Sequence, residues 1–167
     1  MGETGTAGTG NGGTGGASRP PPFIPPRNRM LVAILALLGL LVSLYMLAYA
    51  LGWAGTLICT VGDCERVQSS PFSRIGPFPV AAFGVLGYLV LMAVSLSGLQ
   101  PASRGSRTVP LALLAGGLLG VAFSAYLTYL EAFVIRAWCQ WCVSSAVIMV
   151  LAFLASLPEL RRLGRSG

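Results

Sequence analysis

The chain has 167 residues, of which 54% are hydrophobic and only 10% are charged. Soluble globular domains carry about 25% charged residues, so this composition excludes an ordinary soluble domain and indicates an integral membrane protein. The formal net charge is +6, and every basic residue is an arginine, because the sequence contains neither lysine nor histidine. The lack of histidine removes the commonest general base and metal ligand, and we expect neither a metal nor a nucleic acid as a partner.

Residues 1–29 are rich in glycine and threonine and end in a cluster of prolines. Such a segment buries too little apolar surface to offset the entropy lost on ordering, so it predicts a disordered tail. At the other end of the chain, residues 158–167 are predicted to form a short basic tail.

Four apolar stretches lie between these tails, each close to the ~20 residues that a helix needs to cross ~30 Å of hydrocarbon. They are Met30–Leu51, Pro79–Leu99, Val109–Leu130 and Cys139–Leu157, and none has a charged residue in its interior. Only a helix satisfies its own backbone in lipid at this length. The sequence therefore predicts an all-α membrane domain over residues 30–157, a bundle of four transmembrane helices with short connections and up-down-up-down packing.

The arginines predict the orientation of this bundle through the positive-inside rule. One side of the predicted topology carries Arg19, Arg27, Arg29, Arg104, Arg107, Arg161, Arg162 and Arg165. The other side carries only Arg66, Arg74 and Arg136. Both termini are therefore expected in the cytoplasm, with the loops at 52–78 and 131–138 on the outer face of the inner (plasma) membrane.

A cleaved signal peptide is the alternative for the first apolar stretch, because Ala48-Tyr49-Ala50 has the A-x-A form of a cleavage site. The apolar run before it is longer than the usual ~7–15 residues of a signal peptide. We therefore expect the first stretch to remain as a transmembrane helix.

All four cysteines fall on the outer side of this topology, where disulfides form. Cys59 and Cys64 lie in the first outer loop, whereas Cys139 and Cys142 open the last helix. A zinc site is disfavoured because the two pairs lie too far apart in the sequence. Two structural disulfides are a second alternative, but a bond between Cys139 and Cys142 would close almost no loop and add little stability.

A Cys-x-x-Cys pair at the start of a helix is typical of a redox-active dithiol, because the helix dipole and the unpaired amides stabilise a thiolate. The loop pair Cys59 and Cys64 encloses a turn-like segment, which favours a mobile dithiol that meets an outside protein. No G-x-G-x-x-G stretch follows an apolar strand and opens a helix, which is the context that would indicate a nicotinamide or flavin. A lipid-soluble quinone is the electron acceptor that this chemistry favours.

Three features together resemble the vitamin K epoxide reductase family in its bacterial form. They are the loop cysteine pair, the stretch CERVQSS at 64–70 and the CQWC at 139–142 that opens the last helix. The resemblance covers residues 30–157. It implies a membrane thiol oxidoreductase that generates disulfides and passes electrons to ubiquinone or menaquinone. It also implies a separate redox partner, a thioredoxin-like protein of the DsbA kind.

Roles for the four cysteines follow from the resemblance by position. Cys142 matches the cysteine that faces the quinone, and Cys139 matches its partner. Cys64 resembles the shuttle cysteine that attacks the Cys139–Cys142 disulfide. Cys59 resembles the cysteine that exchanges with the outside protein.

Two further residues are predicted to contact the quinone. Ser70 matches a serine near the quinone in the family, although a turn or cap serine is an equal alternative. Phe83 is expected to line the pocket, with plain core packing as the alternative. The vertebrate enzymes carry an asparagine and a tyrosine near the vitamin K head group, and the matching positions here are Val80 and Ala146. This difference weakens any expectation of epoxide reduction.

Two rival functions remain at this point. A DsbB-type enzyme performs the same reaction on another scaffold, but it carries its Cys-x-x-Cys in the first outer loop. A non-catalytic membrane subunit would hold its cysteines as structural disulfides. Glu131, near the end of the third helix, is a candidate for handling protons, with a solvated interfacial carboxylate as the alternative.

Overall fold

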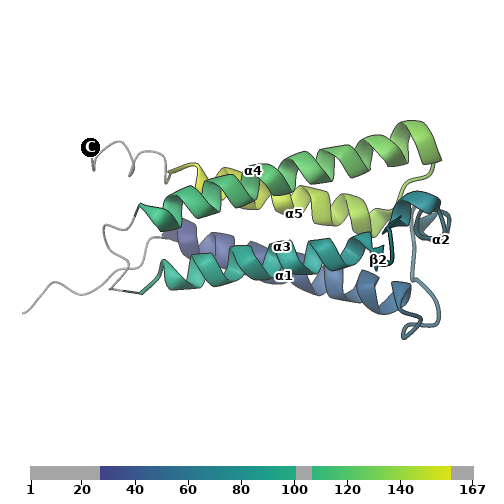
Figure 1. Cartoon of the computed structure of the whole chain (residues 1–167), viewed down its shortest axis with the longest axis horizontal. Helices are drawn as coiled ribbons and strands as arrows, with labels where there is room; N and C mark the ends of the chain where they lie inside the picture. Colours follow the sequence, from purple (N-terminus) through teal and green to yellow (C-terminus); the bar gives the residue numbers. More distant parts are fainter. Residues whose placement is uncertain (1–26, 101–106, 159–167) are drawn as a thin grey trace, which may run out of the picture.

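The computed structural model describes residues 27–100 and 107–158. The tails expected over 1–29 and 158–167 lie outside the described residues except at their inner ends. Within the described residues, four long helices make up most of the molecule (Figure 1): α1 (Arg27–Ala50), α3 (Val80–Ser97), α4 (Thr108–Tyr129) and α5 (Gln140–Ser156). The helix α4 continues directly into η3 (Leu130–Ile135), a π-helical segment.

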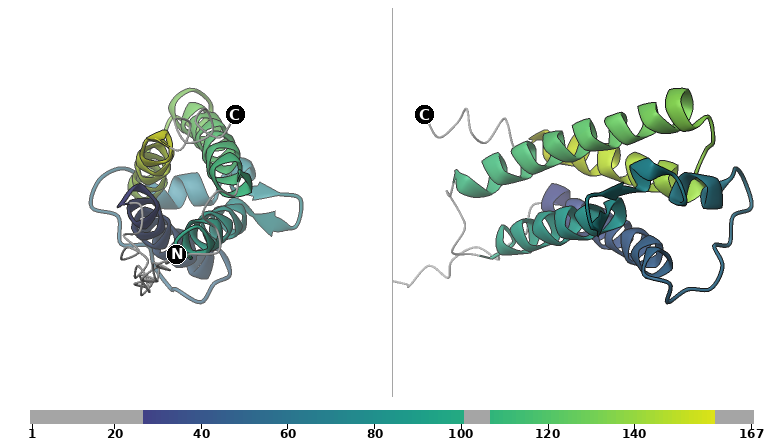
Figure 2. Two further views of the ribbon diagram at one scale, coloured as in Figure 1. Left: turned by 90° about the vertical axis from the view of Figure 1, so that its left-hand side faces the viewer. Right: turned by 45° about the vertical axis from the view of Figure 1, so that its right-hand side comes forward.

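Successive long helices run in opposite directions (Figure 1). The helix α1 packs against α3 and α5, and α4 packs against α5 and α3, so the four helices enclose a common core (Figure 2). The centre of this core consists of Val32, Ala36, Leu40, Tyr88, Leu91, Val109, Leu113 and Met149. The ring of Tyr88 lies directly on Gly39, where any Cβ atom would overlap it. Glycine at this position therefore allows α1 and α3 to approach closely.

The helix α1 begins at Arg27, a few residues before the predicted start. The reason is a buried contact at this end of the bundle: the Nη1 atom of Arg29 donates a hydrogen bond to the carbonyl oxygen of Gly98 (2.6 Å). This bond joins the first turn of α1 to the end of α3, so the helix continues past the apolar stretch.

Three helical segments of the described chain are long and apolar enough to cross a membrane, namely Arg27–Ala50, Val80–Ser97 and Thr108–Ile135. Large apolar side chains point away from the bundle along them, and Leu119 is 73% exposed. Such a surface suits contact with lipid rather than water. The predicted membrane protein is confirmed to this extent, while α5 is apolar but shorter.

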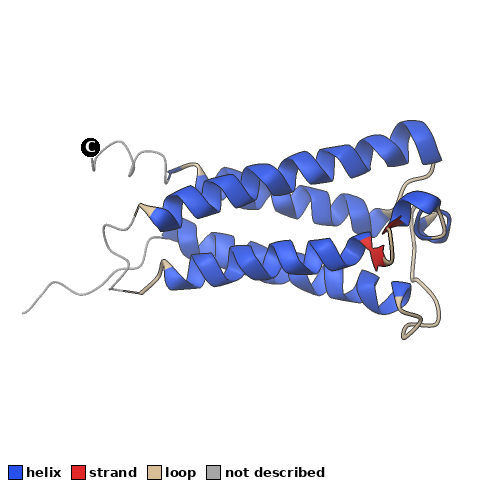
Figure 3. Cartoon of the chain, in the orientation of Figure 1, coloured by secondary structure: helices blue, strands red, loops and turns tan. Residues whose placement is uncertain are grey.

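The connection between α1 and α3 is the largest departure from a simple bundle. It contains α2 (Cys64–Gln68), η1 (Pro71–Ser73), β1 (Arg74–Ile75) and β2 (Phe78–Pro79). The two strands pair antiparallel, with Arg74 opposite Pro79, and Gly76 supplies the positive φ (61°) of the turn between them. Figure 3 shows that these elements gather at one end of the bundle, where α5 begins.

Candidate functional site

All four cysteines lie at this end of the bundle, in two different bonding states. Cys59 and Cys64 form a disulfide with a Cα–Cα distance of 6.1 Å. Cys139 and Cys142 are free thiols. Cys64 and Cys139 are both buried and belong to one apolar cluster, whereas Cys59 is only partly buried at its edge. The fold therefore brings together two cysteine pairs that lie far apart in the sequence.

The two residues before Cys64 pair through their backbone with Trp138 and Cys139. Gly62 forms an isolated antiparallel bridge with Cys139, and the Asp63 amide donates to the carbonyl oxygen of Trp138 (2.8 Å). Gly62 has a φ of +90°, which an L-residue rarely adopts. The Asp63 carboxylate also accepts the amide N–H of the third residue of α2 (3.1 Å) and so caps that helix. Backbone pairing thus places the start of α2 beside the start of α5.

We call Cys59 and Cys64 the outer pair and Cys139 and Cys142 the inner pair. The two residues between the inner cysteines, Gln140 and Trp141, bind the loop segment that precedes Cys64. The Oε1 atom of Gln140 accepts hydrogen bonds from the Thr60 amide (3.1 Å), the Thr60 hydroxyl (2.8 Å) and the Val61 amide (3.1 Å). The indole of Trp141 donates to the carbonyl oxygen of Ile58 (2.9 Å). Sequence reasoning gave neither residue a role. The sequence signal that could have indicated these contacts is the presence of two side chains able to form hydrogen bonds, an amide and an indole, between the two cysteines of the motif.

Replacing Gln140 with alanine is expected to loosen the loop. The change removes three hydrogen bonds worth about 0.5–1.5 kcal/mol each, and each 1.4 kcal/mol is about tenfold in an opening equilibrium. Hydrogen exchange at the amides of Thr60 and Val61 should therefore be at least about tenfold faster. The control is Gln100→Ala, at the other end of the bundle, which should leave these amides unchanged. Equal exchange in wild type and Gln140→Ala would contradict the role of this side chain.

The inner dithiol sits at the start of α5 in a geometry that favours a thiolate. Cys139 is the N-cap residue, and its sulfur accepts the amide N–H of Cys142 (3.4 Å). Unpaired amides and the dipole of the helix stabilise negative charge there. The Cys139 amide in turn donates to Oε2 of Glu131 (3.1 Å). Glu131 is only 3% exposed, so the alternative of a solvated interfacial carboxylate is wrong.

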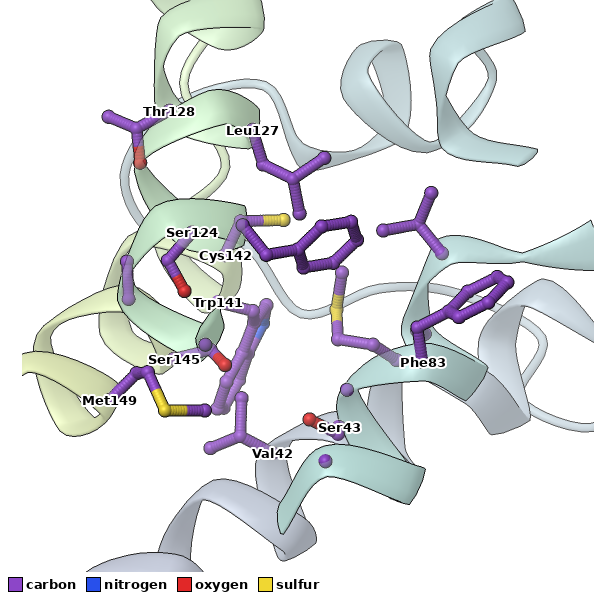
Figure 4. Close-up of a pocket in the computed structure, with 18 of the residues that line it drawn as sticks. Val42, Ser43, Phe83, Ser124, Leu127, Thr128, Trp141, Cys142, Ser145 and Met149 are labelled. Atoms are coloured by element: carbon purple, nitrogen blue, oxygen red, sulfur yellow. The ribbon is translucent and has the colours of Figure 1, made fainter. Parts of the chain in front are cut away.

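Cys142 opens into a cavity of about 490 Å³ between the helices. This volume is within the range of small-molecule sites, and the walls are mostly apolar. Figure 4 shows the Cys142 side chain entering the cavity from α5, with Phe83 on the α3 side. Ser70 also lines the cavity, and its hydroxyl donates to the carbonyl oxygen of Val67 (2.7 Å). The structure thus brings Ser70, Phe83 and Cys142, the three predicted quinone contacts, to one cavity.

Residues 30–157 match the model of the Vitamin K epoxide reductase family. The chain belongs to the vitamin K epoxide reductase family. Membership in this family makes the chain a membrane thiol oxidoreductase. Proteins of this family in general use quinones. The alternative of a DsbB-type scaffold is thereby excluded. The resemblance inferred from the loop cysteines, CERVQSS and CQWC is confirmed.

In this member of the vitamin K epoxide reductase family, Cys142 lies in the lining of the cavity. Val80 and Ala146, which stand at the positions of the vertebrate asparagine and tyrosine, both line the cavity. Neither side chain offers a hydrogen bond. The amide nitrogen of Gln68 lies 4.0 Å from the sulfur of Cys142 and gives the cavity a polar group beside the thiol.

The bonding states of the four sulfur atoms bear on two alternatives, a zinc site and a pair of structural disulfides. In this structure the sulfurs of Cys59 and Cys64 are bonded to each other, so they are not available as zinc ligands. Among the described residues, the group with metal-ligand spacing is Glu131, Cys139 and Cys142, whose ligating atoms all lie within 4.8 Å of one another. One pair is oxidised and the other reduced, which suits exchange between the pairs better than a purely structural role.

Proposed function

We propose that the protein generates disulfides in proteins outside the cytoplasm. A reduced thioredoxin-like partner of the DsbA kind reduces the Cys59–Cys64 disulfide. The resulting thiolate of Cys64 attacks the Cys139–Cys142 disulfide, so that the outer disulfide forms again and the inner pair becomes a dithiol. Each exchange breaks one S–S bond and forms another, and two electrons and two protons finally reach a quinone, either ubiquinone or menaquinone.

The burial of the four sulfurs supports this order and carries the proposal. Cys59 is partly buried at the edge of the loop, Cys64 and Cys139 are buried together, and Cys142 lines the cavity. The cysteines thus form a series from the surface to the cavity. The bonding states agree with one step of the relay, after the outer pair has passed its electrons inward.

The cavity suits a quinone by its size, its apolar walls and the thiol at its edge. The bound quinone would supply the two-electron acceptor that the dithiol requires. Cys142, Ser70 and Phe83 are the proposed contacts, and the helices that line the cavity would orient the thiol and limit the access of water. The apolar side chains of Val80 and Ala146 support quinone reduction over epoxide reduction.

We further propose that residues 30–157 cross the inner membrane four times, with both termini in the cytoplasm and the cysteines outside. Three segments have the required length. The helix α5 has 17 residues, which rise about 26 Å at 1.5 Å per residue. This length nearly covers ~30 Å of hydrocarbon, and its cap residue Cys139 then lies at the outer boundary. The excess of arginines at the opposite end supports this orientation.

The test is expression in bacterial cells that lack their own disulfide-generating enzyme. The wild-type protein is expected to restore disulfides in secreted proteins, and Cys142→Ser is expected to reduce the yield to background, because the inner disulfide can no longer form. The control is Ser144→Ala, an exposed position on the same turn of α5 that should keep full activity. Failure of the wild type, or equal restoration by Cys142→Ser, would refute the mechanism and favour a non-catalytic subunit.

A further inference from the structure

Glu131 is a buried carboxylate that the proposed relay does not yet use. An isolated charged carboxylate is costly to bury and is normally retained only with specific partners. The partners of this side chain belong to the dithiol: Oε2 accepts the amide N–H of Cys139 (3.1 Å), and the carboxylate lies within 4.8 Å of the sulfurs of Cys139 and Cys142. Glu131 also lines the same cavity as Cys142.

The local backbone explains how the carboxylate reaches this position. Glu131 is the second residue of the π-helical segment η3, and such segments occur frequently at functional sites. Arg136 follows the segment in a left-handed conformation (φ 55°), and the Ala137 amide donates a hydrogen bond to the carbonyl oxygen of Glu131 (3.2 Å). This turn reverses the chain, so that the backbone of Cys139 lies beside the side chain of Glu131.

The chemistry of the inner pair requires a group of this kind. When two thiols become a disulfide, two protons must leave, and the sequence contains neither histidine nor lysine to accept them. Among the described residues, the other carboxylates are Asp63 and Glu65, and both are exposed. The nearby cations Arg66 and Arg136 are exposed as well.

The tyrosine hydroxyls of the neighbouring helices are engaged elsewhere. The hydroxyl of Tyr45 on α1 accepts the amide N–H of Ile58 (3.2 Å), and that of Tyr88 on α3 donates to the carbonyl oxygen of Ser145 (2.7 Å). Glu131 is therefore the buried acid or base that the described chain places against the dithiol.

We propose that Glu131 accepts the protons that Cys139 and Cys142 release when their disulfide forms, and passes them into the cavity. This inference rests on the proposed function. Two S–H bonds break and one S–S bond forms; the two electrons go to the quinone of that function. The two protons pass to the quinone one at a time through the carboxylate, which ends the cycle ionised.

The test uses Glu131→Gln, which keeps an oxygen for the Cys139 amide but cannot accept a proton. Without quinone, the rate at which a thiol reagent alkylates the reduced inner pair is measured against pH. A charged carboxylate repels a thiolate that forms within 4.8 Å of it. The Gln variant should therefore reach its full alkylation rate at lower pH than the wild type. With quinone, disulfide formation in the same variant should slow by about 10²-fold or more, the usual contribution of a general base.

These two readouts move in opposite directions only if the carboxylate carries protons. Glu65→Gln, on the exposed side of α2, is the matched control and should change neither. If Glu131→Gln reduced quinone as fast as the wild type, slowed both reactions together, or left the alkylation profile unchanged, the inference would be overturned while the relay remained. If the wild type itself reduced no quinone, the proposed function would fail, and this inference with it.

Discussion

Replacing Cys64 with serine is expected to stop disulfide formation and to leave the extracytoplasmic partner attached to Cys59. Cys59 is the less buried member of the outer pair, so exchange with another protein begins at its sulfur. Without Cys64, the sulfur that pairs with Cys59 is missing, so the mixed disulfide is not resolved from the side of this chain. The adduct should appear as a band of higher mass in non-reducing electrophoresis, and mass spectrometry of the linked peptides should locate the bond at Cys59.

The matched control for this experiment is Cys59→Ser. The remaining Cys64 is 1% exposed and lies in the apolar cluster with Cys139, so this variant should trap no partner. An adduct at Cys64 in the Cys59→Ser variant, and none at Cys59 in the other, would reverse the order of the outer pair.

Gly62→Ala is expected to uncouple the outer pair from the inner pair. A Cβ atom at this position would overlap the carbonyl oxygen of Trp138, and the backbone has a φ of +90°. The left-handed conformation alone costs an L-residue about 1–2 kcal/mol, and the overlap also strains the bridge to Cys139. Because 1.36 kcal/mol corresponds to about tenfold in rate, oxidation of a reduced partner should slow by about tenfold or more.

The comparison variant for this change is Gly55→Ala in the same loop, where no atom lies within 4 Å of an added Cβ. It should oxidise the partner at the wild-type rate. A chemically reduced inner pair should still pass electrons to quinone in Gly62→Ala, since the change does not touch the cavity. Loss of that second reaction as well would mean that the substitution damages the whole bundle and not the link between the pairs.

The helices were predictable because a long run of apolar residues is a signal that each segment carries by itself. The position of the cysteines at one end followed from the same lengths, since Cys59 lies in the loop between the first two apolar stretches and Cys139 begins the last one. The family resemblance added Ser70, whose place in the cavity no spacing rule indicates. These parts of the site depend on local sequence or on a known motif.

The remaining parts depend on contacts between distant segments. The helices are apolar on every side, so no amphipathic face indicates which residues point inward. For this reason the burial of Glu131 could not be distinguished from exposure at the membrane boundary. The short strands β1 and β2 have only two residues each, too few for an alternating pattern. The contact of Gln140 with Thr60 joins residues 80 positions apart, which no local pattern reveals.

The use of Gln140 and Trp141 as loop contacts limits how this dithiol can be altered. A protein engineer who exchanged this dipeptide to shift the reduction potential of the pair would also remove the acceptor for Thr60 and the donor for Ile58. Such an exchange would therefore also loosen the contact between the loop and the start of α5, through which the proposed relay passes. Changes at positions outside the motif would leave this contact in place.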